Sequence, residues 1–177
     1  PVALFVGVLE RYKNVAGLAA AWRLVAARLP DARLHLVGSG TDTEIAEALE
    51  REGVRWDRRL TAAEVAQSLD DARVLLLPSA SEGLPRVAME AFLRGRAVIG
   101  SAAGGIPDII EHDVNGLLVP YGDVEALADA IVAVLSDHEL AVRLGDGALR
   151  SSTQWNRTPT EYARKVRDLV ETVLARS

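Results

Sequence analysis

The sequence lacks cysteine altogether, has few aromatic residues and contains no long apolar run. With no cysteine among its 177 residues, the chain has no disulfide, no thiolate nucleophile and no thiolate metal ligand. A membrane-spanning helix requires about 20 consecutive apolar residues. The apolar runs here are far shorter, and no signal-peptide pattern is visible. We therefore expect a soluble, cytoplasmic domain.

The residues that are present have an ordinary globular composition, 49% hydrophobic and 25% charged. The length suits one domain with a full core. A formal net charge of −5 disfavours nucleic acid as a partner, although Arg55, Arg58 and Arg59 are clustered. The histidines at 35, 112 and 138 are scattered, without a second ligand at metal spacing, so no metal site is expected.

Short apolar runs alternate with helical patterns along the chain. The predicted strands are 2–6, 33–37, 54–56, 74–77, 97–100 and 117–119. The predicted helices are 15–29, 43–52, 61–69, 85–94, 109–111, 123–135, 139–144 and 159–175. Capping boxes at Thr61 with Glu64 and at Thr158 with Glu161 mark two helix starts. This alternation predicts an α/β fold, a Rossmann-like parallel sheet with helices on both faces.

Glycine-containing loops follow several of the predicted strands, at Gly7, at Gly38 and Gly40, and at Gly104 and Gly105. In a parallel sheet these loops share one edge, where ligands bind. Adjacent glycines at 104 and 105 would let a ligand approach the backbone closely, although alone they would suit an ordinary loop. The dinucleotide fingerprint G-x-G-x-x-G is excluded, because Thr43 stands where its third glycine belongs.

Residues 79–92, Ser-Ala-Ser-Glu-Gly-Leu-Pro-Arg-Val-Ala-Met-Glu-Ala-Phe, are the stretch around which the chain is organised. Glu82 precedes a helix that Pro85 opens, and the helix mouth is a natural anion site. Apolar residues surround Glu90 on nearly every helical face, so we expect it to be buried and to need hydrogen-bond donors. In the alternative interpretation Glu82 is a loop charge and Glu90 pairs with a structural arginine.

The same stretch resembles the E-x7-E signature of the family 4 retaining glycosyltransferases of the GT-B class, which use nucleotide sugars. Glu82 and Glu90 fall on its two glutamates. Other segments of the chain also resemble sequence motifs of this family. They are Phe5–Leu9 followed by Lys13, Gly104–Ile110, Asn115–Val119, and Trp155 before the last helix. The resemblance covers essentially the whole chain but only half of such an enzyme, the C-terminal donor-binding domain. An N-terminal acceptor domain is therefore expected outside this chain.

The resemblance implies a role for each matching residue. Glu90 would accept hydrogen bonds from the ribose hydroxyls and Glu82 from those of the transferred sugar. Lys13, otherwise an ordinary surface lysine, would contact the diphosphate. The remaining donor-binding positions are Gly7, the turn of Gly83, Leu84, Pro85 and Arg86, the loop of Gly104 and Gly105, and, near the base, Gly38, Gly40 and Arg59. Neither a metal nor a cofactor is implied, and any membrane association would come from the missing domain.

Two positions depart from the family pattern. Val8 stands where the family has an arginine that contacts the diphosphate, and Asn14 stands where it has glycine. Arg11 or Arg86 could supply the missing cation. Two other functions therefore stay open beside glycosyl transfer. One is an epimerase acting on a nucleotide sugar, and the other is a non-catalytic binding domain, which Val8 favours.

Overall fold

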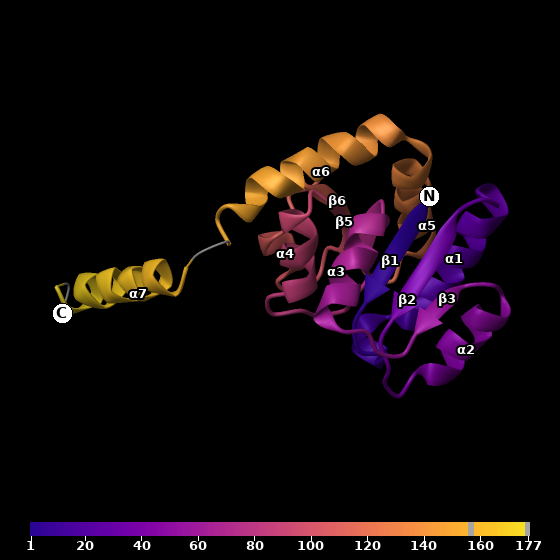
Figure 1. The fold of residues 1–177 in the computed structure, drawn as a ribbon, viewed down its shortest axis with the longest axis horizontal. Coiled ribbons are helices and arrows are strands. Elements are labelled where there is room, and N and C mark those ends of the chain that lie inside the picture. The colour runs from indigo at the N-terminus through magenta and orange to yellow at the C-terminus, as the bar shows by residue number, and fades with distance from the viewer. Residues whose placement is uncertain (156–157, 176–177) are drawn as a thin grey trace.

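A single parallel sheet of six strands forms the centre of the computed structural model, which describes residues 1–155 and 158–175 (Figure 1). The strands are β1 (Val2–Val6), β2 (Arg33–Val37), β3 (Arg55–Asp57), β4 (Val74–Leu77), β5 (Ala97–Ser101) and β6 (Gly116–Val119). Their spatial order is β3-β2-β1-β4-β5-β6, and every pairing is parallel. The predicted α/β fold is confirmed. Strands β1 to β3 follow one another toward one side of the sheet and β4 to β6 toward the other, so the order of the strands switches between β1 and β4.

Helices cover both faces of this sheet. The helices of the described chain are α1 (Val15–Arg28), α2 (Thr43–Arg51), α3 (Ala62–Asp71), α4 (Arg86–Leu93), α5 (Val124–Ser136), α6 (His138–Ser152) and α7 (Pro159–Leu174), with 3₁₀ helices at Arg11–Lys13 and Ile106–Asp108. All of the α-helices except α7 bury residues. Helix α1 packs against α5, and α4 packs against α6. Both capping boxes form as predicted, at the starts of α3 and α7.

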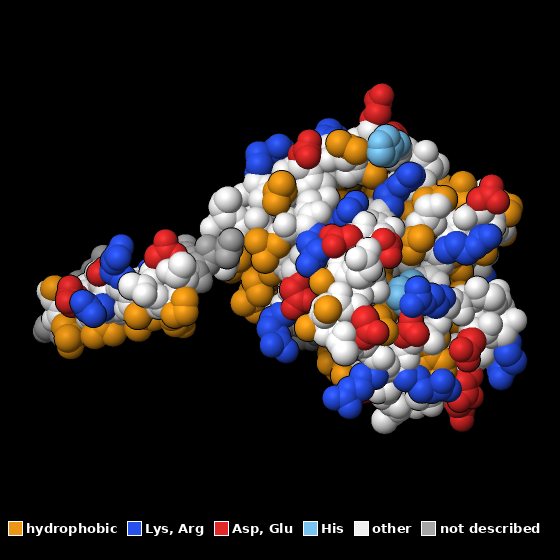
Figure 2. All heavy atoms as spheres, in the orientation of Figure 1, with side chains coloured by type: hydrophobic (Ala, Val, Ile, Leu, Met, Phe, Trp, Pro, Cys, Tyr) orange, Lys and Arg blue, Asp and Glu red, His pale blue; other side chains and the backbone are white. Residues whose placement is uncertain are grey.

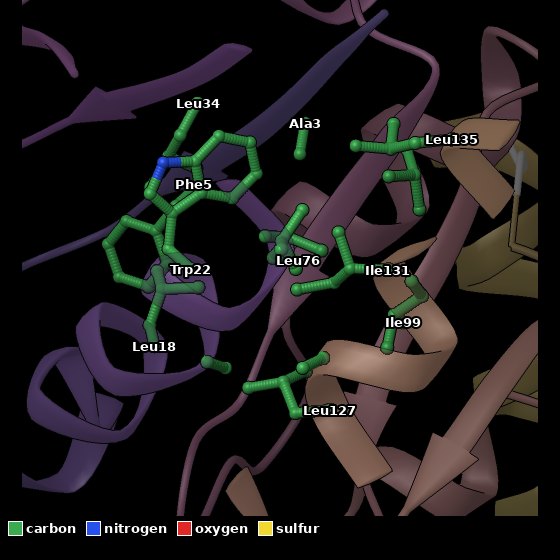
Figure 3. Close-up of a cluster of buried hydrophobic side chains, with 14 of the residues drawn as sticks. Ala3, Phe5, Leu18, Trp22, Leu34, Leu76, Ile99, Leu127, Ile131 and Leu135 are labelled. Atoms are coloured by element: carbon green, nitrogen blue, oxygen red, sulfur yellow. The ribbon is translucent and has the colours of Figure 1, made fainter. Parts of the chain in front are cut away.

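Two hydrophobic clusters, one on each face, hold the layers together. Because successive strand side chains point to opposite faces, Phe5 of β1 belongs to the first cluster and Leu4 to the second. In the first, Phe5 lies beside Trp22 of α1 and Leu34 of β2 (Figure 3). Each such fully buried side chain stabilises the fold by about 1.5–3 kcal/mol. The two faces of the sheet are therefore both covered, and a ligand can reach the sheet only at the ends of its strands.

The three tryptophans are core residues, though to different degrees. Trp22 and Trp56 are buried in the first cluster. Trp155 packs, partly buried, against the second. All three rings therefore help to hold the layers together.

Helix α6 is longer than the sequence predicted. It runs through Ser152, well past the predicted end at residue 144. Gly145 lies inside it because the helix passes close to the turn after α4, where a Cβ atom at 145 would come within 2.3 Å of the Gly95 carbonyl oxygen. The short helical turn was also misplaced, since it forms at Ile106–Asp108 and not at 109–111.

A buried histidine joins the edge strand β3 to its neighbour β2. The Nε2 atom of His35 lies 2.8 Å from Oδ2 of Asp57, and its side chain is 7% exposed. Burial lowers the pKa of His35 below its ordinary value, although the hydrogen bond to Asp57 opposes that shift. His35 therefore has a structural role between these strands.

Because the unfolded chain takes up a proton on His35 more readily, stability should fall on acidification. We expect the free energy of unfolding to decrease between about pH 7 and pH 5. Urea unfolding at several pH values measures this. In His35→Gln the curve should be flatter over the same range, and an equally steep curve would assign the effect to other groups.

Helix α7 differs from the others in that none of its residues is buried. Apolar side chains, among them Tyr162, Leu169 and Leu174, are exposed on it. Figure 2 shows hydrophobic side chains, in orange, gathered along one side of this helix. Among the described residues, no helix combines the length and the apolar character that crossing a bilayer requires.

Candidate functional site

A cleft of about 660 Å³ opens beside the C-terminal ends of β1 and β4, between the loops that follow them and helices α3 and α4. These two strands are neighbours although they are far apart in the sequence, so their loops turn away to opposite sides and leave a crevice. Of the predicted site residues, the structure brings together Gly7, Lys13, Glu82, Leu84, Pro85, Arg86 and Glu90 around this cleft.

The centre of the cleft is an ion pair between Lys13 and Glu82. Lys13 lies in the 3₁₀ helix after β1, and its Nζ atom is 2.5 Å from Oε1 of Glu82 in the loop after β4. The two side chains are only 11% and 12% exposed. Lys13 is therefore no ordinary surface lysine, and the site holds an amine and a carboxylate in fixed positions.

Ser79, which the sequence reasoning did not single out, orients this carboxylate. Its Oγ donates a hydrogen bond of 2.9 Å to the same Oε1 atom of Glu82. Ser79 is fully buried, and its carbonyl oxygen accepts a hydrogen bond from the buried Ser101. The other carboxylate oxygen, Oε2, accepts no hydrogen bond from the described residues. It is thus the oxygen available to a ligand hydroxyl.

Helix α4 carries Glu90, and here the sequence expectation was wrong. Glu90 is exposed, not buried. Only Ala88, Ala91 and Phe92 of this helix are buried, and the opposite side faces the cleft. Glu90 can therefore reach a ligand directly, without the burial that its apolar neighbours in sequence suggested.

The glycines at 104 and 105 support the Glu82 loop and do not line the cleft. The Gly105 N–H donates to the Glu82 carbonyl oxygen at 2.7 Å. A Cβ atom at position 105 would lie 2.3 Å from the Gly83 carbonyl oxygen. The glycines were expected to let a ligand come close to their backbone. In the structure, the backbone of residues 82–83 occupies that position.

Gly38, Gly40, Gly83 and Arg59 also lie outside the lining of the cleft. The loop of Gly38 and Gly40 packs beside the loop after β1, where the Leu9 N–H donates to the Ser39 carbonyl oxygen at 3.0 Å. The Trp56 indole N–H donates to Gly38 at 2.9 Å. These glycines therefore hold the neighbouring loops together, and their predicted contact with a base stays a prediction.

The sequence reasoning missed the wall that helix α3 and the loop before it build opposite α4. Leu60, Val65 and Leu69 line the cleft there, and Arg94 lines it at the far end of α4. The signal was present in the sequence, since the capped helix after β3 begins at the same sheet edge. This apolar wall could cover one face of a flat ligand group.

Comparison with known proteins agrees with this geometry. The family described as "Glycosyl transferases group 1" matches residues 1–137. The chain belongs to this family. Among relatives of this group 1 chain, alpha-maltose-1-phosphate synthase of Mycolicibacterium smegmatis is 35% identical over 162 residues, covering 82% of the chain and 41% of the synthase.

Solved structures give the same result for the fold. Sucrose-phosphate synthase from Thermosynechococcus elongatus aligns with all of the chain and 46% of its own, with a TM-score of 0.82 and 32% identity. Anabaena HepE in complex with UDP aligns with 96% of the chain and 48% of its own, with a TM-score of 0.82 and 23% identity, and shows the shared fold. The group 1 chain thus spans less than half the length of these relatives.

The two departures from the family pattern have different structural consequences. Asn14 takes the left-handed conformation, with φ of 54°, and its side chain caps helix α1 by accepting from the Gly17 N–H at 3.2 Å. Asparagine is the residue that best replaces glycine in this conformation. Val8 is 43% exposed and does not line the cleft, so it offers nothing to an anion.

No group of three or more potential metal ligands occurs in residues 1–155 and 158–175. The charged groups of the cleft in this group 1 glycosyltransferase chain are instead three cations, Lys13, Arg86 and Arg94, and the carboxylates of Glu82 and Glu90. Such a set can neutralise an anion and accept hydrogen bonds from hydroxyls in the same space.

Proposed function

We propose that the chain is the donor-binding domain of a retaining glycosyltransferase, which moves a sugar from a nucleoside diphosphate sugar to an acceptor. The observation that supports this most strongly is the composition of the cleft, in which cations lie beside two carboxylates with free acceptor capacity. A sugar nucleotide offers the complementary groups, a diphosphate between two polyhydroxylated rings.

In this proposal each side chain has one task. Lys13 compensates the charge that grows on the diphosphate as the bond between the sugar and the phosphate oxygen breaks. Oε2 of Glu82 accepts from a hydroxyl of the transferred sugar, while Ser79 and Lys13 hold Oε1. Glu90 accepts from the ribose hydroxyls, and the wall of Leu60 and Val65 contacts the donor from the α3 side.

The acceptor site is assigned to a separate N-terminal domain. The relatives matched are more than twice as long as the matched part of this chain, and this size difference leaves room for such a domain. We therefore expect the chain to bind the donor but to show little or no transfer by itself.

Calorimetric titration with UDP, GDP, ADP and TDP tests the proposal, beginning with UDP because HepE was solved with it. We expect one diphosphate to bind, and its sugar nucleotide to bind as well. If none of the four binds, the chain is not a donor-binding domain.

Because Val8 offers no phosphate contact, a non-catalytic binding domain is the second candidate. It predicts the same titration but no transfer after the chain is joined to an acceptor domain. An epimerase would instead return the donor nucleotide with an altered sugar, which product analysis detects.

A further inference from the structure

Three cations line the cleft, and two of them have a partner among the residues that the structure describes. Lys13 pairs with Glu82, and Nη1 of Arg94 lies 2.5 Å from Oδ2 of Asp70. Arg86 has no hydrogen bond or ion pair within residues 1–155 and 158–175. Its guanidinium is therefore the cleft cation that remains available to a ligand.

The position of Arg86 in its helix also requires explanation. It is the first residue of α4, where the helix dipole repels a cation, and the first turn contains no acidic residue to offset this. Lys13 brings a second positive charge to the same cleft. A bound anion would relieve the repulsion between these charges.

Arg86 also lies one helical turn before Glu90. Residues four apart share a helix face, about 6 Å apart along the axis, and both line the cleft. No ion pair joins them, although such a pair is geometrically common. One face of α4 thus presents a donor group first and an acceptor group next, in the order in which a nucleotide presents its phosphates and its ribose.

We propose that Arg86 is the second diphosphate-binding cation of this site and replaces the contact that Val8 cannot make. The inference rests on the proposed function, and it selects Arg86 over Arg11. Arg11 is exposed and does not line the cleft, whereas Arg86 shares the cleft with Lys13. The guanidinium can bind two phosphate oxygens in parallel, which suits a diphosphate.

The test compares variants with the tightest binder among UDP, GDP, ADP and TDP and with its nucleoside. Arg86→Ala should lower affinity for the diphosphate about ten-fold, as for a charge-assisted hydrogen bond near the surface, and leave the nucleoside unchanged. Arg11→Ala is the matched control and should change neither. Adding Val8→Arg to Arg86→Ala should recover part of the lost affinity, because it returns a cation on the β1 side.

The outcomes separate this inference from the function on which it rests. If the unaltered chain binds a diphosphate and Arg86→Ala binds it equally well, the role of Arg86 is rejected and the donor site stands. An equal loss for diphosphate and nucleoside also rejects it, since a phosphate contact cannot affect the nucleoside. Absence of any recovery with Val8→Arg would reject the replacement of position 8 by Arg86. If no diphosphate binds the unaltered chain, the proposed function fails, and this inference fails with it.

Discussion

Replacing Lys13 with alanine is expected to weaken binding of a nucleoside diphosphate about 100-fold, while binding of the nucleoside changes less than about two-fold. The amine lines the cleft, with only 11% of the Lys13 side chain exposed. A hydrogen bond to a charged group is worth about 1.5–3 kcal/mol, and poor access of water favours the upper value. Calorimetric titration of both ligands measures the difference.

The control for Lys13 must account for the partner that it leaves behind. Lys13→Ala removes the cation beside the nearly buried Glu82, so the free energy of unfolding should also fall, by about 1–3 kcal/mol. The double variant Lys13→Met with Glu82→Gln removes both charges and should regain much of this stability without regaining affinity for the diphosphate. Equal losses for diphosphate and nucleoside would rule out a phosphate contact.

Replacing Glu90 with alanine is expected to reduce nucleotide affinity by about 1.5–3 kcal/mol, because the ribose loses a charged acceptor. Glu90 is exposed and makes no ion pair within the described residues, so the unfolding temperature should stay the same. The measurement is calorimetry with the ribonucleotide and with its 2′,3′-dideoxy analogue. Glu90→Ala should weaken only the first.

A matched variant distinguishes a ribose contact from a general change in charge. Glu47→Ala removes a similarly exposed carboxylate from α2, outside the cleft, and should leave both affinities unchanged. If Glu90→Ala weakens the dideoxy analogue as much as the ribonucleotide, the hydroxyls are not its partners. The assignment of Glu90 would then be wrong, even if the nucleotide still binds.

The fold could be predicted from the sequence because its signals are local. Apolar runs such as Val74–Leu77 located the strands to within one or two residues, and the Thr61 and Thr158 capping boxes located two helix starts. The resemblance to glycosyltransferases also indicated Lys13, Glu82 and Glu90, which lie around one cleft.

The remaining features depend on which surfaces meet in space. Glu90 was expected to be buried because its sequence neighbours are apolar, but the sheet and α6 cover only one side of α4. Helix α6 continues through Gly145, where the neighbouring backbone excludes a side chain. Nothing in the sequence marks Ser79 as a site residue. Its role depends on the hydrogen bond to the Glu82 carboxylate, which forms only because the loop turns Glu82 back toward Ser79.

Direct backbone hydrogen bonds link the loops of the site. Among them are those from Leu9 to Ser39, from Ala80 to Tyr12 and from Gly105 to Glu82, at 3.0, 2.7 and 2.7 Å. Loops linked in this way are ordered before a ligand arrives. Binding then avoids the loss of backbone entropy, about 1–2 kcal/mol for each residue that would otherwise become ordered. The contact energy of a donor would go into affinity and orientation, so that a domain with few charged contacts could still hold its ligand in one pose.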